Sequence, residues 1–163
     1  MIDRFDYKAA PELIRVEDLH KDFGSLKVLA GITETIHKGE VVSLIGPSGS
    51  GKSTLLRSLN LLEVPTAGEI DFDGVDITKK KVKTEAGKWV KLDLDKHRQK
   101  MGMVFQHFNI FPHMSVIDNI TLAPTLLGKK SKDEAIADAE ALLARVGLSD
   151  NRDIKPTRLS GGK

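Results

Sequence analysis

The chain has 163 residues, of which 40% are hydrophobic and 29% charged, the composition of an ordinary globular protein with one domain. The 25 Lys and Arg residues nearly balance the 23 Asp and Glu residues, so the net charge of +2 does not indicate a nucleic acid partner. Because cysteine is absent, disulfides and thiolate metal sites are excluded. The amino terminus does not resemble a secretory signal, and the apolar runs are far shorter than the ~20 residues that cross a bilayer.

The first half of the chain is predicted to be rich in strands. Alternating apolar and polar residues predict strands over 13–19 and 28–36. Residues 41–45 (VVSLI) form an almost continuous aliphatic run, which is typical of a strand covered on both faces of a parallel sheet. Apolar residues at helical spacing then predict a helix over 52–62.

A hairpin and a polar excursion are expected next. Residues 69–77 contain Asp73-Gly74, a pair favoured in hairpin turns. The polar excursion spans 79–92 and includes the basic cluster 79–83. We interpret this cluster either as a solvated loop or as a contact with an anionic partner.

The second half of the chain is predicted to be helical. A short helix is expected at 93–100, followed by an apolar strand at 101–106 and a loop rich in aromatic residues. Ser115 is placed to begin another helix. The sequence 131–134 is a capping box, and the helix that it opens is expected to end before Gly147. One domain with a helical lobe is therefore favoured over two domains.

Residues 46–53, GPSGSGKS, fit the pattern G-x-x-x-x-G-K-[ST] without deviation and are called the phosphate loop below. A strand is predicted before this loop and a helix after it, which is the context that the motif requires. Glycines allow successive backbone N–H groups to turn toward one anion, and the helix adds its unsatisfied N–H groups and its dipole. The motif predicts binding of a nucleoside triphosphate. The residues expected to bind it are Gly46, Ser48, Gly49, Ser50, Gly51, Lys52, Ser53 and Thr54.

Within this loop, two side chains have distinct expected roles. Lys52 is expected to reach the β- and γ-phosphates as a mobile positive charge, so it is a candidate catalytic residue. The Ser53 hydroxyl is expected to bind Mg²⁺.

Two further stretches extend the pattern: MVFQHFNIFPHMSVIDNI at 103–120 and LSGG at 159–162. Together with GPSGSGKST they resemble the ATP-binding subunit of ABC transporters, over nearly the whole chain from Leu13 onward. The segment FQHFNIFPH is similar to the branch that drives uptake of polar amino acids. The resemblance implies an α/β fold of the P-loop NTPase (ABC) type, with an antiparallel β subdomain and a helical lobe.

The resemblance also implies how the fold is organised along the chain. Residues 1–163 are expected to form one incomplete nucleotide-binding domain, with a β-rich core over about 13–106 and a helical lobe over about 107–163. The expected ligands are ATP and Mg²⁺. The expected location is cytoplasmic, peripheral on the cytoplasmic face of the cell membrane.

Several site residues are implied by the family alone. Gln106 matches the glutamine that contacts Mg²⁺ and the attacking water, so it is a second candidate catalytic and metal-binding residue. Phe23 matches the aromatic residue that stacks on adenine, although a core position is the alternative. The signature residues Ser160, Gly161 and Gly162 would bind the γ-phosphate of ATP held by a second copy of the subunit, in a head-to-tail dimer.

The other implied partners are transmembrane permease subunits and, indirectly, an extracytoplasmic solute-binding protein. Phe108, Ile110 and Phe111 are candidates for the permease interface, or for internal packing.

The sequence departs from the family at its end. Lys163 stands where glutamine is usual, and the 163 residues do not include the strand that ends in a magnesium-binding aspartate and a catalytic glutamate, nor the switch histidine. His97, His107 and His113 are upstream and are expected on the surface or in loops. We therefore expect slow hydrolysis at best, and we expect residues 41–45 and 103–105 to expose strand edges that lack neighbours.

The sequence also bears on three classes of function other than an ABC transporter subunit. A nucleotide-binding fragment without turnover is the main alternative. A small P-loop kinase would need a lid that carries arginines, and a chromosome-associated ABC ATPase would need a long heptad insertion. The sequence contains neither feature.

Overall fold

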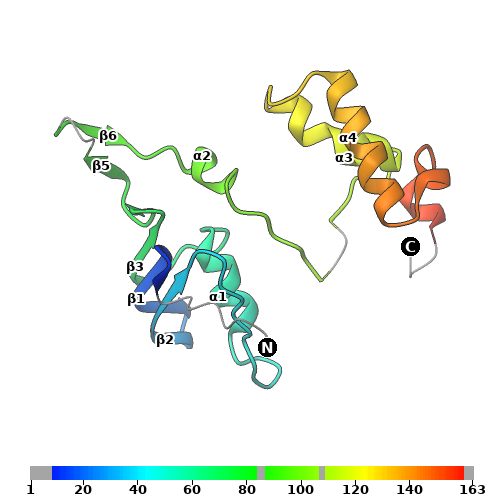
Figure 1. Ribbon diagram of the computed structural model, residues 1–163. Helices are drawn as coiled ribbons and strands as arrows, with labels where there is room; N and C mark the ends of the chain where they lie inside the picture. The colour runs from blue at the N-terminus through cyan, green and yellow to red at the C-terminus, as the bar shows by residue number, and fades with distance from the viewer. Residues whose placement is uncertain (1–8, 84–86, 107–108, 160–163) are drawn as a thin grey trace, which may run out of the picture. The chain divides into compact units, whose positions relative to one another are not determined.

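The computed structural model describes residues 9–83, 87–106 and 109–159 (Figure 1). The chain divides into two compact units, Met1–Met103 and Val104–Lys163. Within the described ranges, the first unit contains every strand and the second unit is helical. None of the helices in these ranges is long and apolar enough to span a membrane.

The first unit is built on a four-stranded antiparallel sheet in the order β2-β1-β3-β4. Its strands are β1 (Glu12–Phe23), β2 (Leu26–His37), β3 (Ala67–Phe72) and β4 (Val75–Asp76). The two long strands and the short hairpin predicted from the sequence are therefore confirmed. In the hairpin turn, Asp73 and Gly74 have φ values of 53° and 79°. Positive φ at both central residues matches the right-handed twist of the flanking strands.

The core of this unit is formed by side chains of β1, β2 and β3 together with three residues outside the four-stranded sheet. Its buried apolar residues are Val16, Leu19, Leu29, Leu61, Ile70, Phe72, Ile77 and Leu92. The pairing of β1 with β3 shifts register between Glu17 and His20, opposite Gly68. At that shift the backbone of Gly68 passes so close to Asp18 that an added Cβ would lie 2.3 Å from the Asp18 carbonyl oxygen. Only glycine fits this crossing of the two strands.

Two strands predicted from the sequence are absent. Residues 40–46 and 101–105 form neither strand nor helix, and the side chains of Val41, Ile45 and Val104 are 85%, 94% and 98% exposed. An aliphatic run becomes a buried parallel strand only when neighbouring strands pair with it and both faces are covered. No described strand pairs with either segment. The prediction of strands was therefore wrong, while the expected exposure is confirmed for residues 41–45 and for Val104, but not for Met103 and Phe105, which are half-buried.

Helix α1 (Lys52–Leu59) follows the phosphate loop and ends three residues earlier than predicted. Its last turn is closed by the side chain of Arg98, at the end of α2 (Leu94–Arg98). The Arg98 guanidinium donates hydrogen bonds to the carbonyl oxygens of Asn60, at 3.1 Å, and Leu61, at 2.8 Å. A positive charge at the carboxyl end of a helix also interacts favourably with the negative end of the helix dipole. The Arg98 side chain therefore connects α2 to the helix that begins at the phosphate loop.

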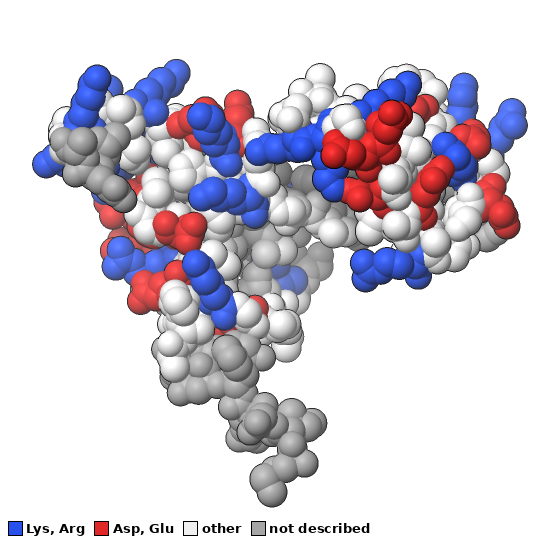
Figure 2. All heavy atoms as spheres, turned by 45° about the horizontal axis from the view of Figure 1, so that its top comes forward, with Lys and Arg blue, Asp and Glu red and all other residues white. Residues whose placement is uncertain are grey.

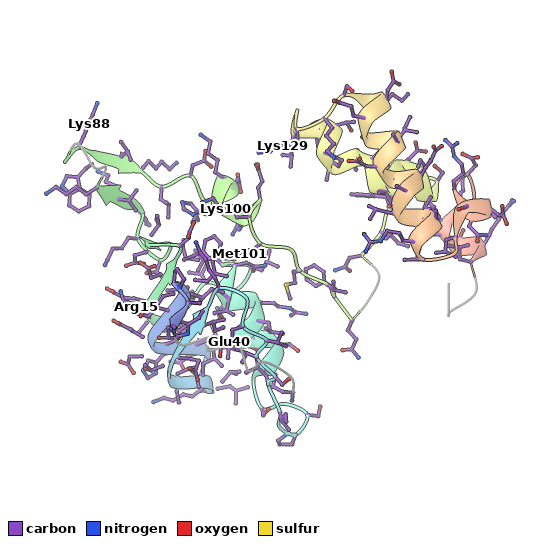
Figure 3. The ribbon with its side chains drawn as sticks, in the orientation of Figure 1. Arg15, Glu40, Lys88, Lys100, Met101 and Lys129 are labelled. Atoms are coloured by element: carbon purple, nitrogen blue, oxygen red, sulfur yellow. The ribbon has the colours of Figure 1, made fainter. Side chains whose placement is uncertain are left out.

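The polar excursion predicted at 79–92 contains a second, two-stranded sheet. Its strands are β5 (Lys81–Lys83) and β6 (Trp89–Lys91), and they pair antiparallel. Figure 3 shows Lys88 at the outer end of this hairpin, and Lys100 and Met101 at the far side of α2. The interpretation of the basic cluster 79–83 as a loop is therefore wrong for Lys81–Lys83, which form β5. The short alternating stretches KVK and WVK are the signal that could have indicated strands.

The second unit packs α3 (Val116–Leu126) against α4 (Lys132–Arg145), with short 3₁₀ turns at Ser149–Asn151 and Pro156–Arg158. Ile117, Ala139 and Leu143 form its buried core. The Ser115 side chain caps α3, as predicted, by accepting a hydrogen bond from the N–H of Asp118. The expected end of α4 is also confirmed, since Val146 is the carboxyl cap of the helix and Gly147 follows it with a φ of 71°.

The predicted capping box at the start of α4 is formed in full. The Glu134 N–H donates to Ser131 Oγ at 3.3 Å, and the Ser131 N–H and hydroxyl donate to Glu134 Oε2 at 2.8 and 2.7 Å. These bonds to the carboxylate, first the hydroxyl and then the backbone N–H, hold the pKa of Glu134 below its ordinary value. The stability that Glu134 contributes is therefore present above the ordinary pKa of a glutamate and lost as the pH falls through the lowered one.

We expect Ser131→Ala to destabilise the protein by about 1 kcal/mol near neutral pH, because it removes one acceptor and one donor from the cap. The free energy of unfolding measured in urea, at neutral and at acidic pH, checks this. The loss of stability is expected to be smaller at acidic pH, where Glu134 is protonated and its carboxylate no longer strengthens the capping box. Ser149→Ala is the control, since Ser149 is exposed and forms no side-chain cap. Equal losses in the two variants would contradict the assignment.

Candidate phosphate-binding site

The phosphate loop turns sharply into α1 through two glycines. Gly49 and Gly51 have φ values of 81° and 87°, a left-handed conformation that side chains disfavour. Gly51 is the amino-terminal cap of α1, and among the described residues this helix has no side-chain cap. The first turn also lacks acidic residues. An amino-terminal helix turn of this kind presents free N–H donors and a positive dipole end, which suits an anion.

Gly51 is held against the sheet. A Cβ added to it would lie 2.9 Å from the carbonyl oxygen of Val28 and 3.1 Å from a methyl group of Leu29. The first turn of α1 can therefore seat on β2 only because residue 51 has no side chain. Gly46 is less restricted, since its Cβ would lie 2.8 Å from Ser50 Oγ, a side-chain atom that can rotate away. Close approach and positive φ together explain the glycine at 51, while positive φ alone explains the one at 49.

Lys52 folds back over the loop that precedes it. Its Nζ donates hydrogen bonds to the carbonyl oxygens of Gly46, at 2.9 Å, and Pro47, at 2.7 Å, and to Ser50 Oγ at 3.2 Å. All three acceptors are neutral, so an anionic oxygen in the loop would form the stronger bond to this ammonium. The lysine is therefore held where a bound phosphate would attract it. Ser53 is exposed at the start of the helix.

Phe23 lies at the end of β1, 46% exposed, and pairs with Leu26 across the hairpin turn. The alternative of a core position is therefore wrong for Phe23. Two and three residues further along β2, Val28 and Leu29 lie against Gly51, so Phe23 is at the end of the hairpin on which the phosphate loop is seated. The ammonium of Lys21 lies 4.7 Å from the centre of the Phe23 ring. Sequence reasoning missed this cation, although alternation along β1 places residues 21 and 23 on one face.

The other predicted site residues lie in the second unit or outside the described residues. Gln106 is exposed in a bend of the second unit, so its role stays a prediction. Ser160, Gly161 and Gly162 lie outside the described residues, as do His107 and Phe108. Ile110 and Phe111 are exposed, and the Phe111 ring contacts His113 edge-on.

Histidines and carboxylates form no metal site among the residues described. No group of three or more His, Asp or Glu side chains in these ranges is arranged to hold a metal ion. His97 was expected on the surface or in a loop, and this was wrong: it lies in α2, half-buried, with its ring edge-on to Phe72 in the core. Ser53 and Gln106 therefore remain the residues proposed for Mg²⁺.

A glycine loop that leads into an uncapped helix, with a lysine folded over it, defines a P-loop protein. The model of the ABC transporter family matches residues 29–163, and the chain belongs to this family. It is 50% identical to the arginine transport ATP-binding protein ArtM of Bacillus subtilis, over 93% of this chain and 59% of ArtM. The L-cystine import ATP-binding protein TcyC of Bacillus subtilis is 43% identical, again over 93% of this chain and 59% of TcyC. The glutamate/aspartate import ATP-binding protein GltL of Escherichia coli is 44% identical, over 93% of this chain and 58% of GltL.

A solved structure gives the same assignment for the fold. The ATP-binding cassette MJ0796, solved as a dimer in a post-hydrolysis state with ADP and Pi, matches with a TM-score of 0.77 and 31% identity. The match covers 92% of this chain and 64% of that one. The fold is therefore the ABC type of the P-loop fold, with its antiparallel sheet and its helices, as the sequence predicted. The chain spans 58–59% of the length of these curated relatives.

Proposed function

We propose that the chain is the ATP-binding part of a subunit that couples ATP binding and hydrolysis to the import of polar amino acids through a membrane ABC transporter. The observation that carries this proposal is the phosphate loop, with its glycine turn, uncapped helix and folded Lys52. The substrate class is supported by the three relatives named above, whose names refer to arginine, cystine, and glutamate or aspartate.

In this proposal the nucleotide lies along one end of the first unit. The triphosphate binds the N–H groups from Gly49 to Thr54, and Lys52 leaves its carbonyl partners for the β- and γ-phosphates. Adenine stacks on the Phe23 ring, on the face opposite the Lys21 ammonium. For Mg²⁺, the proposed ligands are the hydroxyl of Ser53 and, by family resemblance, the amide oxygen of Gln106, both of which are groups that suit this ion.

The proposed partners follow from the family and from the dimer of the solved relative. A second copy, facing head to tail, would contribute Ser160, Gly161 and Gly162 to the γ-phosphate. Transmembrane permease subunits would dock at the loop that contains Ile110 and Phe111, whose exposure leaves them available. A solute-binding protein on the other side of the membrane would act indirectly. The subunit would then lie in the cytoplasm against the membrane.

A titration of the 163-residue chain with ATP and Mg²⁺ tests the proposal. We expect saturable binding that is weaker for AMP, because the loop is built for the β- and γ-phosphates. Phe23→Ala is expected to weaken ATP binding by roughly 10-fold through lost stacking, while Phe23→Tyr keeps the ring and the affinity. Retained affinity in Phe23→Ala would contradict the role of Phe23. Absence of ATP binding by a folded chain would overturn the proposal as a whole.

Turnover by the same 163-residue polypeptide is proposed to be slow. Lys52, Ser53 and Gln106 supply charge and positioning, but hydrolysis also needs a group that orients the attacking water. The second candidate function, nucleotide binding without turnover, rests on this point and on the exposed segments 40–46 and 101–105. Phosphate release at the rate of full-length family members, abolished by Lys52→Ala, would exclude this candidate.

A further inference from the structure

We propose that one face of the β5–β6 hairpin is a contact site for an anionic phospholipid surface. This inference does not depend on nucleotide binding. The cross-strand register places Lys81 opposite Lys91, Val82 opposite Val90 and Lys83 opposite Trp89. Because directly opposed residues share a face of a sheet, one face presents Val82 and Val90. The other face, called the lysine face below, presents Lys81, Lys83, Trp89 and Lys91.

The two faces have different surroundings. Val82 is half-buried and packs against the core of the first unit. All four residues of the lysine face are exposed. The hairpin is therefore anchored through Val82 and directs three ammonium groups and an indole toward solvent. Figure 2 shows basic side chains gathered at this end of the first unit.

The charges of the lysine face are not compensated within the described part of the chain. Lys81, Lys83 and Lys91 form no ion pair with a described residue, whereas the nearby Lys79 pairs with Glu69 and Asp76. Lys81 and Lys91 also line a groove of about 680 Å³ whose described lining includes five basic side chains and no carboxylate. Asp93 and Asp95, on the next segment, pair with Lys96 and Arg98.

The direct opposition of Lys81 and Lys91 is unfavourable in water, since like charges across two strands repel. An anionic surface removes this repulsion. The hairpin lies outside the four-stranded sheet, and an isolated two-stranded sheet has little stability of its own. A counter-charge at this face would therefore stabilise the hairpin as well as bind it.

Trp89 indicates which anionic partner is favoured. It is the single tryptophan of the chain and its side chain is 63% exposed. An amphipathic ring flanked by lysines is typical of side chains at the interface between lipid headgroups and acyl chains. The three charges are lysines, which act as point charges, and the face lacks the arginine forks that read individual phosphates or carboxylates. A flat anionic lipid surface fits this combination.

Trp89 also supplies the test, because its fluorescence reports on this hairpin alone in the 163-residue chain. Vesicles of phosphatidylcholine containing phosphatidylglycerol are expected to bind the chain in flotation. They are also expected to shift the emission of Trp89 to shorter wavelength and to protect it from acrylamide. Vesicles of phosphatidylcholine alone are expected to do neither. Binding is expected to weaken as salt rises, a measurement that needs no variant.

Paired variants separate this face from general charge. Replacing Lys81, Lys83 and Lys91 with glutamine is expected to lower partitioning onto anionic vesicles by roughly 100-fold, at about fivefold for each lysine. The control replaces Lys27, Lys132 and Lys155, three other exposed lysines, and changes the net charge equally. The control variant is expected to keep its binding. Circular dichroism checks that both variants are folded, and loss of the repulsion between Lys81 and Lys91 favours folding of the first.

Three results would overturn the proposal. One is equal loss of binding in the two triple variants, which would assign it to net charge. Another is flotation without a change in Trp89 emission, which would assign it to another surface. The third is an equal shift of Trp89 emission by double-stranded DNA at the same ionic strength, which would make the face a general polyanion site.

Discussion

Replacing Gly68 with alanine is expected to destabilise the first unit by at least about 3 kcal/mol. The added Cβ would lie 2.3 Å from the Asp18 carbonyl oxygen and 2.7 Å from both the Asp18 carbonyl carbon and the Glu17 carbonyl oxygen. These atoms are backbone, so the clash is relieved only if β1 and β3 separate. In addition, the φ of Gly68 is 91°, which disfavours alanine on its own.

Gly74→Ala is the matched control for this prediction. Gly74 has a φ of 79°, close to that of Gly68, but an added Cβ would have no other atom within 4 Å. Its substitution is expected to cost only about 1 kcal/mol, through conformation alone. The difference between the free energies of unfolding of the two variants, measured in urea, therefore gives the energetic cost of the close approach at Gly68. Similar losses in both would mean that the two strands do not pass as closely as described.

The sequence predicted the parts of the fold that depend on local signals. The alternation in β1 and β2, the Asp73-Gly74 turn and the capping serines 115 and 131 each act within a few residues, and each was confirmed. The run at 41–45 is different. Its composition suits a buried strand, but a strand also needs partners from elsewhere in the fold, and none of the described strands pairs with it. Composition alone could not supply that information.

The hairpin of β5 and β6 illustrates the opposite error. Its strands have three residues each and three of their six side chains are Lys, so polarity favoured a solvated loop for the basic cluster. Packing of Val82 on the core gives this segment an apolar anchor that no local window contains. The closing of α1 by Arg98 was equally out of reach, because it joins residues that are 37 and 38 positions apart.

For the candidate site, the motif predicted the loop and its helix, and the structure supplied the reasons for single residues. The motif requires glycine at position 51, but the cause, contact with Val28 and Leu29 on β2, is visible only in three dimensions. The same contact connects the loop to the strand that pairs with β1 and Phe23. The site therefore depends on the sheet, although no residue of the motif lies in a strand.

That dependence gives the prediction with the largest expected effect on binding. Gly51→Ala is expected to weaken ATP binding by roughly 100-fold or more, because a displacement of about 1 Å at a binding loop has an effect of this size. A Cβ at this position would lie 2.9 Å from the Val28 carbonyl oxygen, so the first turn of α1 must move away from β2. The N–H groups of the loop and the backbone of Lys52 would move with it.

Gly39→Ala is the control, since Gly39 has a φ of 82°, close to the 87° of Gly51, and open space around it. Both variants accept the same unfavourable backbone conformation, and only Gly51→Ala also meets the sheet. ATP titrations at a temperature where circular dichroism finds both folded separate lost binding from lost folding. If Gly51→Ala binds ATP as well as Gly39→Ala does, the seat of α1 on β2 does not position the phosphates. The loop would then have to act independently of the sheet beneath it.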